Sequence, residues 1–188
     1  KLLVLNGSPK KDGTVATLLR AVVEGAAPKH EVEWIDLYDL TMQPCLGCMK
    51  CRPDGECCLP EDDAHRVGRK IREADGLIVG TPTYWGNMSS QLKTLFDRIV
   101  PAIISQQPNG IPVPRHRGKH AVIATACTTP WPANFLFHES RGAVRAVREV
   151  LSWGGYRIQG VVVQPGTKER DGASKRVIDW AKRVGQRL

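Results

Sequence analysis

Five of the six cysteines of this chain lie between residues 45 and 58. Cys45, Cys48 and Cys51 are separated by two residues each, and Cys57 and Cys58 follow after a short gap. Thiolates at this spacing can converge on one metal centre or on one iron–sulfur cube. A four-thiolate zinc site is compatible too, although such sites usually use two separated pairs. Reduced structural thiols and a redox disulfide are also open; a disulfide scaffold is not expected without a secretion signal.

A second group of reactive side chains lies in the loop 6–17, directly after the first apolar run. Gly7 and Gly13 allow backbone conformations that are closed to other residues. A helix begins near Gly13, so its free amides and its positive dipole end face this loop. The sequence is neither a G-x-x-x-x-G-K-[ST] loop nor a G-x-G-x-x-G loop. We interpret the loop as a binding site for a phosphate group, with an ordinary glycine turn as the alternative. The loop supplies hydroxyl groups and positive charges from Ser8, Lys10, Lys11, Thr14 and Thr17.

Two further loops carry aromatic and hydroxyl side chains. In the run 80–93, Tyr84 and Trp85 offer flat surfaces to an aromatic ligand, and the Asn87 amide offers hydrogen bonds. Core aromatics beside a turn are the alternative. In the run 125–132, Thr128 and Thr129 supply hydroxyls. Cys127 is expected to be a buried small side chain, because no His or Lys adjoins it.

The pattern of apolar residues indicates the elements that position these loops. Apolar runs predict strands at residues 2–5, 32–37, 76–80, 121–126 and 157–164, and helical spacing predicts helices at residues 14–27, 62–74, 89–104, 134–153 and 173–188. Five strands that alternate with five helices predict a parallel sheet with helices on both faces. Ligands of such sheets bind beyond the carboxyl ends of the strands, which is where the three loops belong.

Composition limits the classes of protein to which this chain can belong. Its 188 residues predict one domain, 1–188, with a cysteine-rich loop at about 44–60 and a Pro/Gly-rich loop at about 106–119. No apolar run is long enough to span a membrane. The first apolar run is too short for a signal peptide and is interpreted as a strand, so a cytoplasmic protein is expected. The formal charge of +8 admits an anionic partner, but the basic residues are scattered and resemble no nucleic-acid module.

The loop 7–14, with Gly7-Ser8-Pro9-Lys10 and Gly13-Thr14, resembles the phosphate loop of the NADPH-dependent FMN reductase family. The Pro-x-Tyr-aromatic-Gly-Asn run at 82–87, followed by Gln-Leu-Lys, resembles that family's second signature. The resemblance implies a flavodoxin-like, doubly wound sheet of order 2-1-3-4-5. It also implies FMN as cofactor, although the third loop lacks the family's glycine-rich pattern. The implied FMN contacts are Ser8, Lys10, Gly13, Thr14, Thr17, Pro82, Thr83, Tyr84, Trp85, Gly86, Asn87, Thr128 and Thr129.

The cysteine run is similar to the motif of iron–sulfur flavoproteins, which belong to the same family and hold a [4Fe-4S] cluster near FMN. That similarity implies Cys45, Cys48, Cys51 and Cys57 as ligands and leaves Cys58 spare. Other relatives carry a Pro-Cys-x-Gly-Cys-x-x-Cys loop without a cluster, and their cysteines pack at a subunit interface. The sequence therefore leaves a cluster and structural thiols open.

The resemblance implies an oxidoreductase that passes electrons from NAD(P)H through FMN to a quinone, a flavin or a similar acceptor. No catalytic acid or base is expected, because the flavin carries the chemistry. One alternative is an iron–sulfur electron carrier that receives electrons from ferredoxin, and another is a regulatory or nucleic-acid-binding domain. The family resemblance also implies a homodimer or homotetramer. Neither a membrane nor a nucleic acid is expected as a partner.

Overall fold

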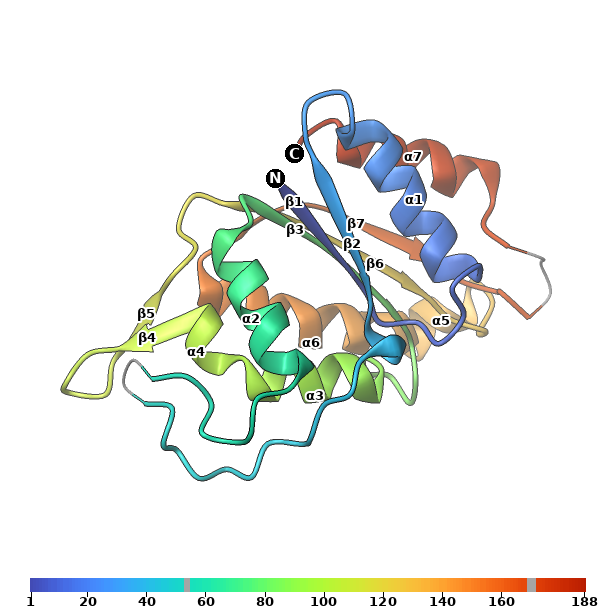
Figure 1. Ribbon diagram of the computed structural model, residues 1–188. Helices are drawn as coiled ribbons and strands as arrows, with labels where there is room; N and C mark the ends of the chain where they lie inside the picture. Colours follow the sequence, from blue (N-terminus) through green and yellow to red (C-terminus); the bar gives the residue numbers. More distant parts are fainter. Residues whose placement is uncertain (53–54, 169–171) are drawn as a thin grey trace.

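A computed structural model describes residues 1–52, 55–168 and 172–188 of the chain (Figure 1). Pro53 and Asp54, inside the predicted cysteine loop, lie outside the described residues. The described strands form a five-stranded parallel sheet in the order β2-β1-β3-β6-β7. This order confirms the predicted flavodoxin-like arrangement. The strands are β1 (Leu2–Asn6), β2 (Val32–Asp36), β3 (Gly76–Pro82), β6 (His120–Ala126) and β7 (Arg157–Gln164).

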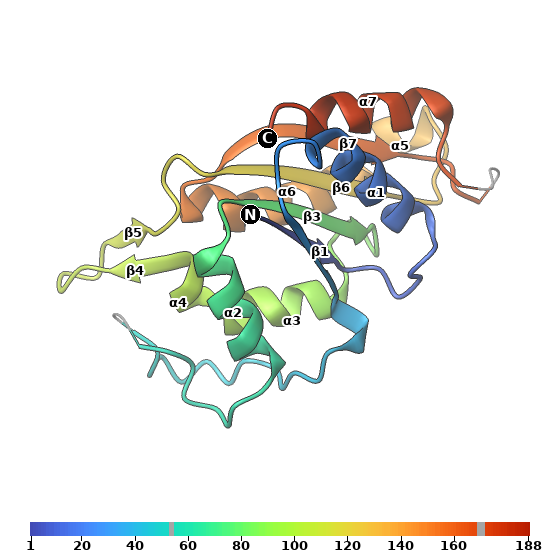
Figure 2. The ribbon, with the colours of Figure 1, turned by 45° about the horizontal axis from the view of Figure 1, so that its top comes forward.

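Helices cover both faces of the sheet, as Figures 1 and 2 show. One face carries α1 and α7, and the other carries α2, α3, α4 and α6. The helices are α1 (Thr14–Ala26), the 3-10 turn η1 (Leu37–Asp39), α2 (Asp63–Glu73), α3 (Ser90–Arg98), α4 (Val100–Ile103), α5 (Ala133–Leu136), α6 (Glu139–Gly154) and α7 (Lys175–Gly185). In the part of the chain that the structure describes, no helix is long and apolar enough to cross a membrane.

The strands are apolar on both faces because each face packs against a helical layer. Along β1, Leu3 and Leu5 belong to the core beneath α2, α3 and α6. Leu2 and Val4 alternate with them and pack against α1 and α7. Side chains of successive strand residues point to opposite faces, so one continuous apolar run fills two cores. The sheet is thereby held between two layers, and its carboxyl-end loops start from a buried, rigid base.

Three predicted segments differ in detail from the structure. The segment 106–119 was predicted as a loop, but it forms most of a short antiparallel hairpin: β4 (Ile104–Gln106) ends at the first residue of the segment, and β5 (Pro112–Pro114) lies within it. Its prolines are accommodated because a two-stranded ribbon leaves one edge of each strand unpaired. The predicted helix 89–104 is broken between α3 and α4, near Pro101, which has no amide hydrogen to donate. The predicted helix 134–153 is divided at His138, whose φ is +60°.

Candidate cofactor site

The loops that follow β1, β3, β6 and β7 meet at the carboxyl end of the sheet (Figure 1). Together they enclose a pocket of about 340 Å³. This volume is in the range of small-molecule sites, which are commonly about 300–1,000 Å³. The pocket is lined by Ser8, Pro9, Lys10, Asp12, Gly13, Thr14, Val15, Thr17, Pro82, Thr83, Tyr84, Ala126, Cys127, Thr128, Thr167 and Gly172.

The loop after β1 is fixed to the sheet at its first residue. The Gly7 amide donates to the Gly80 carbonyl on β3 at 2.8 Å. A Cβ at Gly7 would lie 2.9 Å from that same oxygen, so a larger residue would push the loop away from β3. Ser8 then closes a tight turn, because its Oγ accepts from the Lys10 amide at 3.2 Å. These bonds turn the chain from the strand toward the start of α1.

The N-terminus of α1 faces the pocket without a side-chain cap. Gly13 is the N-cap residue, and the first turn contains no acidic side chain. The free amides and the positive end of the helix dipole therefore remain available to an anion. Thr14 and Val15 of this turn line the pocket. This arrangement fits a phosphate group.

Some of the charged side chains in the loop before α1 are already held in ion pairs and are not free to bind an anion. Asp12 is paired with Arg20 at 2.7 Å, and Lys11 is paired with Asp39 at 2.6 Å. Within the described residues, Lys10 makes no ion pair, and it lines the pocket. Among the residues that the structure describes, Lys10 is thus the lysine of this loop whose charge no carboxylate neutralises.

The loop after β3 forms a tight turn whose ends are bonded to each other. Tyr84 and Asn87 exchange two backbone hydrogen bonds of 3.0 and 2.9 Å. The two central residues, Trp85 and Gly86, have φ values of +50° and +68°. Positive φ at both central positions is the geometry of a type I′ turn, which is unusual for tryptophan. Trp85 is fully exposed at this turn and does not line the pocket.

Tyr84 forms part of the pocket wall, and Thr83 anchors that wall to the neighbouring strand. The Thr83 amide donates to the Ala126 carbonyl at 2.9 Å, and its hydroxyl lies 3.1 Å from the Thr125 hydroxyl. Burial, followed by the nearby Tyr38, raises the pKa of Tyr84 above its ordinary value. The phenol therefore stays protonated at neutral pH and can donate a hydrogen bond.

The loops after β6 and β7 are joined through Cys127. Its carbonyl accepts from the Thr167 amide at 3.1 Å and from the Thr167 hydroxyl at 3.2 Å. Burial raises the pKa of the Cys127 thiol, which agrees with its predicted role as a buried small side chain. Thr167 is a pocket residue that the motifs do not reveal, although its position after the last strand of the sheet is a usable signal.

The structure brings most of the predicted contact residues together, but not all of them. Trp85, Gly86, Asn87 and Thr129 do not line the pocket. Asn87 instead borders a more apolar hollow of about 470 Å³ between α3, α4 and α6. Within the turn, its side-chain oxygen accepts from the Met88 amide at 2.8 Å. The predicted amide–flavin contact therefore remains a prediction.

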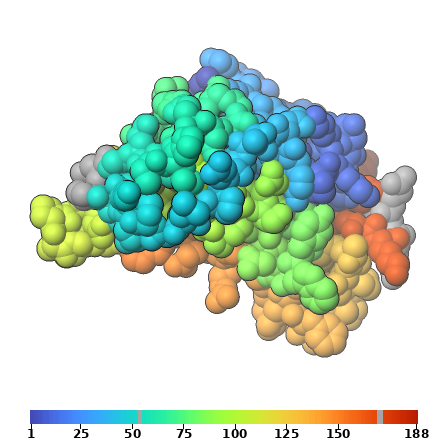
Figure 3. Space-filling view, turned by 60° about the horizontal axis from the view of Figure 1, so that its bottom comes forward, coloured from blue at the N-terminus to red at the C-terminus, as the bar shows by residue number. Residues whose placement is uncertain are grey.

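The cysteine loop lies at the molecular surface next to the β4–β5 hairpin (Figures 1 and 3). Cys45, Cys48 and Cys58 are exposed, while Cys51 and Cys57 are half-buried. The Sγ atoms of Cys48 and Cys58 are 3.5 Å apart. The Lys50 backbone, and then the Cys58 thiol, lower the pKa of Cys48. Among residues 1–52, 55–168 and 172–188, no three His, Cys, Asp or Glu side chains converge closely enough to hold a metal ion.

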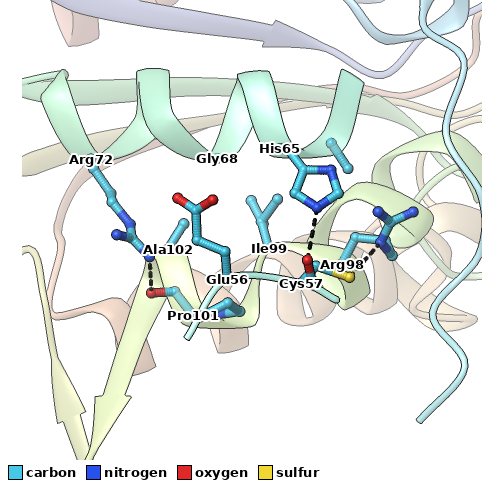
Figure 4. A pocket seen from close by; sticks show the side chains of 10 residues that line it. Glu56, Cys57, His65, Gly68, Arg72, Arg98, Ile99, Pro101 and Ala102 are labelled. Carbon is cyan, nitrogen blue, oxygen red and sulfur yellow. Dashed lines mark hydrogen bonds between the residues drawn. The ribbon is translucent and has the colours of Figure 1, made fainter. Parts of the chain in front are cut away.

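The Cys57 end of this loop lies in a small cavity between α2 and the α3–α4 segment (Figure 4). The Arg98 Nε donates to the Cys57 Sγ at 3.2 Å. His65 Nε2 lies 2.9 Å from the Cys57 carbonyl oxygen. Both the side chain and the backbone of Cys57 are therefore held by neighbouring helices. No sequence motif signals this contact, because Arg98 is 41 residues away in the chain.

Several known proteins resemble the chain in sequence. It is 39% identical to the iron-sulfur flavoprotein MJ1083 of Methanocaldococcus jannaschii over 57% of this chain and 55% of that protein. It is 42% identical to an iron-sulfur flavoprotein of Archaeoglobus fulgidus over 52% of this chain and 48% of the relative. The matches therefore span about half the length of these curated relatives.

Known structures share the fold at lower identity. An azoreductase from Bacillus anthracis aligns over 100% of this chain and 99% of its own, with a TM-score of 0.73 and 20% identity. An NAD(P)H:quinone oxidoreductase from Methanothermobacter marburgensis aligns over 100% of this chain and 94% of its own, with a TM-score of 0.72 and 21% identity. At these identities the likeness establishes the fold.

The family is shown by a match that covers most of the chain. The model of the NADPH-dependent FMN reductases matches residues 1–165, which include the β1 loop, the β3 loop and the cysteine loop. The pocket at the carboxyl end of the sheet and the uncapped helix beside it suit the phosphorylated flavin of such proteins. The chain belongs to the NADPH-dependent FMN reductase family.

Proposed function

We propose that this chain is an FMN-dependent oxidoreductase whose pocket at the carboxyl end of the sheet holds the flavin. The observation that carries the proposal is the uncapped N-terminus of α1, which opens into the pocket beside Lys10, a lysine that forms no ion pair with any residue the structure describes. The flavin phosphate is placed there, against the loop of Ser8, Lys10, Gly13, Thr14 and Thr17. Amide donors, hydroxyls and one lysine charge would then hold the same anion.

The rest of the pocket is assigned to the flavin ring. Bound FMN would supply hydride and electron transfer. The chain's own residues orient the ring and limit its contact with water: Thr83 and Tyr84 form one wall, and Thr128 forms another. The protonated Tyr84 hydroxyl is available as a donor to a ring oxygen. No side-chain acid or base is required by this assignment.

NAD(P)H is the electron donor under this proposal, and a quinone, a free flavin or a similar small molecule is the acceptor. Support for the donor comes from the family, which is named for NADPH-dependent FMN reduction. The M. marburgensis structure, named as an NAD(P)H:quinone oxidoreductase, supports a quinone-type acceptor through the shared fold. The family resemblance also supports a homodimer or homotetramer.

A second candidate is an iron–sulfur flavoprotein in which a [4Fe-4S] cluster exchanges electrons with FMN and with ferredoxin. It is favoured by the relatives named as iron-sulfur flavoproteins and by the cysteine loop. The donor chemistry fits, because thiolates are the usual ligands of such clusters. The loop must close further to bring its sulfurs together, since no three described ligands converge now. Its ligands would be Cys45, Cys48, Cys51 and Cys57.

One preparation tests both candidates. The protein is purified without air, its absorption spectrum is recorded, and iron, acid-labile sulfide and flavin are assayed. It is then mixed with NADPH or NADH and a quinone or free flavin. Flavin with nicotinamide oxidation and no iron supports the first candidate. Four irons and four sulfides per chain with flavin support the second, and failure to bind FMN would contradict both.

A further inference from the structure

Arg98 is a buried cation that touches both ends of the cysteine loop. Its side chain is 0% exposed at the C-terminal end of α3. One Nη atom donates to the Gln43 carbonyl, just before the first cysteine, at 2.6 Å. The Nε donates to the sulfur of Cys57, near the end of the run, at 3.2 Å. A single side chain therefore fixes the entry of the loop and its fourth cysteine.

An acidic partner keeps this cation in place. Asp62, the N-cap residue of α2, accepts from the Arg98 Nη1 at 2.7 Å and from its Nη2 at 3.1 Å. This two-pronged pair neutralises the buried charge, as burial requires. It also leaves the Nε hydrogen pointing at Cys57 (Figure 4). The geometry of the Arg98–Asp62 pair thus sets the direction of the N–H···S bond.

His65 holds the backbone of the same cysteine. Its Nδ1 accepts from the Asp62 amide at 3.1 Å, so the ring hydrogen of the neutral form is on Nε2. That Nε2 donates to the Cys57 carbonyl at 2.9 Å. Asp62 consequently orients both side chains that donate hydrogen bonds to Cys57, namely Arg98 and His65. The other cysteines of the loop receive no comparable support from helices in the described part of the chain.

We propose that Arg98 is the positioning residue of Cys57, and that its N–H···S bond raises the reduction potential of a [4Fe-4S] cluster bound to this loop. The inference rests on the iron–sulfur candidate above. A cluster gains one negative charge on reduction, and part of that charge resides on its ligand sulfurs. A hydrogen bond from a cation to a ligand sulfur stabilises the reduced form more than the oxidised form.

The decisive variant is Arg98→Lys, which keeps the positive charge but removes the Nε donor. The cluster is titrated anaerobically with dithionite and followed by EPR, and iron is assayed in parallel. At a fixed ambient potential, the ratio of reduced to oxidised cluster should fall by roughly three- to tenfold, the scale of one hydrogen bond. A folded variant that has lost its iron would equally support the positioning role.

Arg72→Lys is the matched control. Arg72 lines the same cavity and donates to the Pro101 carbonyl at 3.1 Å, but it contacts no cysteine (Figure 4). Its substitution should leave the ratio unchanged. If Arg98→Lys keeps its iron and the ratio does not move, the inference is overturned while the iron–sulfur candidate stands. Absence of iron from the unmodified protein would overturn both.

A measurement on the unmodified protein decides the matter if Arg98→Lys does not fold. Protein grown with ¹⁵N-arginine is reduced, and pulsed EPR is used to detect nitrogen coupled to the cluster spin. Coupling from an arginine nitrogen, absent from protein labelled with ¹⁵N-lysine, supports the N–H···S bond. No arginine coupling would overturn the proposal.

Discussion

Gly142, in the first turn of α6, lies against the Gly86 carbonyl so closely that a Cβ at position 142 would be 1.9 Å from that oxygen. Glycine is therefore required on the helix side of this contact. The Tyr84–Asn87 turn rests directly on the α6 backbone, and the adjoining Tyr84 lines the pocket. The packing of α6 thus determines where one wall of the proposed flavin site lies.

Gly142→Ala should displace this turn and weaken FMN binding. The added methyl cannot be accommodated without a backbone shift, which typically costs about 1–3 kcal/mol. FMN affinity, measured by quenching of flavin fluorescence, should fall by about fivefold or more. The control is Gly68→Ala on α2, where a Cβ would be 3.4 Å from its nearest neighbour. Equal affinities in the two variants would show that the turn is not part of the site.

Lys10→Ala combined with Thr14→Ala should weaken FMN binding by about 1–3 kcal/mol, the scale of lost charged and neutral hydrogen bonds. Riboflavin, which lacks the phosphate, distinguishes the phosphate contact from a general change in the pocket. Its affinity should be the same for the double variant and the unmodified protein. Lys11→Ala, which removes a lysine already paired with Asp39, is the control and should have little effect. Unchanged FMN affinity in the double variant would mean that the phosphate lies elsewhere.

Trp85→Gly separates a role in flavin binding from a role in stability. Trp85 is fully exposed and has a φ of +50°, so glycine should relieve strain and lose little burial. The free energy of unfolding, measured by urea denaturation, should change by no more than about 1 kcal/mol. Trp85→Val should have a lower free energy of unfolding than Trp85→Gly, because a β-branched residue adopts a positive φ poorly. A drop in FMN affinity at unchanged stability supports the predicted flavin contact, and unchanged affinity rejects it.

Single Cys→Ser substitutions test the proposed ligand set. Under the iron–sulfur candidate, loss of Cys45, Cys48, Cys51 or Cys57 should abolish or sharply lower the iron content of anaerobically purified protein. Cys127→Ser, in the buried loop after β6, is the control and should retain iron. Cys58→Ser should retain it as well. Because Cys58 lies 3.5 Å from Cys48, iron loss in this variant would show that Cys58 replaces one of the four expected ligands.

The sheet could be predicted from the sequence because its strands are short apolar runs separated by helical periodicity, and β1, β3 and β6 conform to that pattern. The order followed from the family resemblance. The β4–β5 hairpin was not predicted, since prolines normally argue against a strand and here occupy positions in an isolated ribbon. The break between α3 and α4 was not predicted either, although Pro101 marks it.

The sequence could predict those residues of the site whose position follows from the end of a strand. Ser8, Thr83 and Thr128 meet because parallel strands end at one edge of the sheet. The hydrogen bond from Arg98 to Cys57 was not predictable. It joins residues that are far apart in sequence, and it depends on how α3 packs against the cysteine loop. The direction of an exposed side chain at a turn, such as Trp85, likewise depends on backbone angles that the residue type does not favour.

His116 makes the stability of the fold sensitive to mild acid. It is 2% exposed, stacks on Tyr156 with ring centroids 4.7 Å apart, and lies 2.8 Å from the Ala102 carbonyl oxygen through Nε2. Burial is the main cause that lowers the pKa of His116 to about 4. The unfolded chain, with an ordinary histidine pKa near 6.5, therefore binds a proton between about pH 6.5 and pH 4 that the folded chain does not.

The contribution of His116 to the free energy of unfolding should consequently be largest above pH 6.5. It should fall by up to about 3 kcal/mol as the pH is lowered toward 4. Carboxylates such as Asp62 also lose stabilisation in acid: burial alone would raise the pKa of Asp62, but its bonds to Arg98 and other donors lower it overall. The test is therefore a difference: urea unfolding of the unmodified protein and of His116→Gln is compared from about pH 7 to about pH 4.5. The variant should show the shallower decline. Parallel curves for His116→Gln and the unmodified protein would show that His116 is not the group responsible.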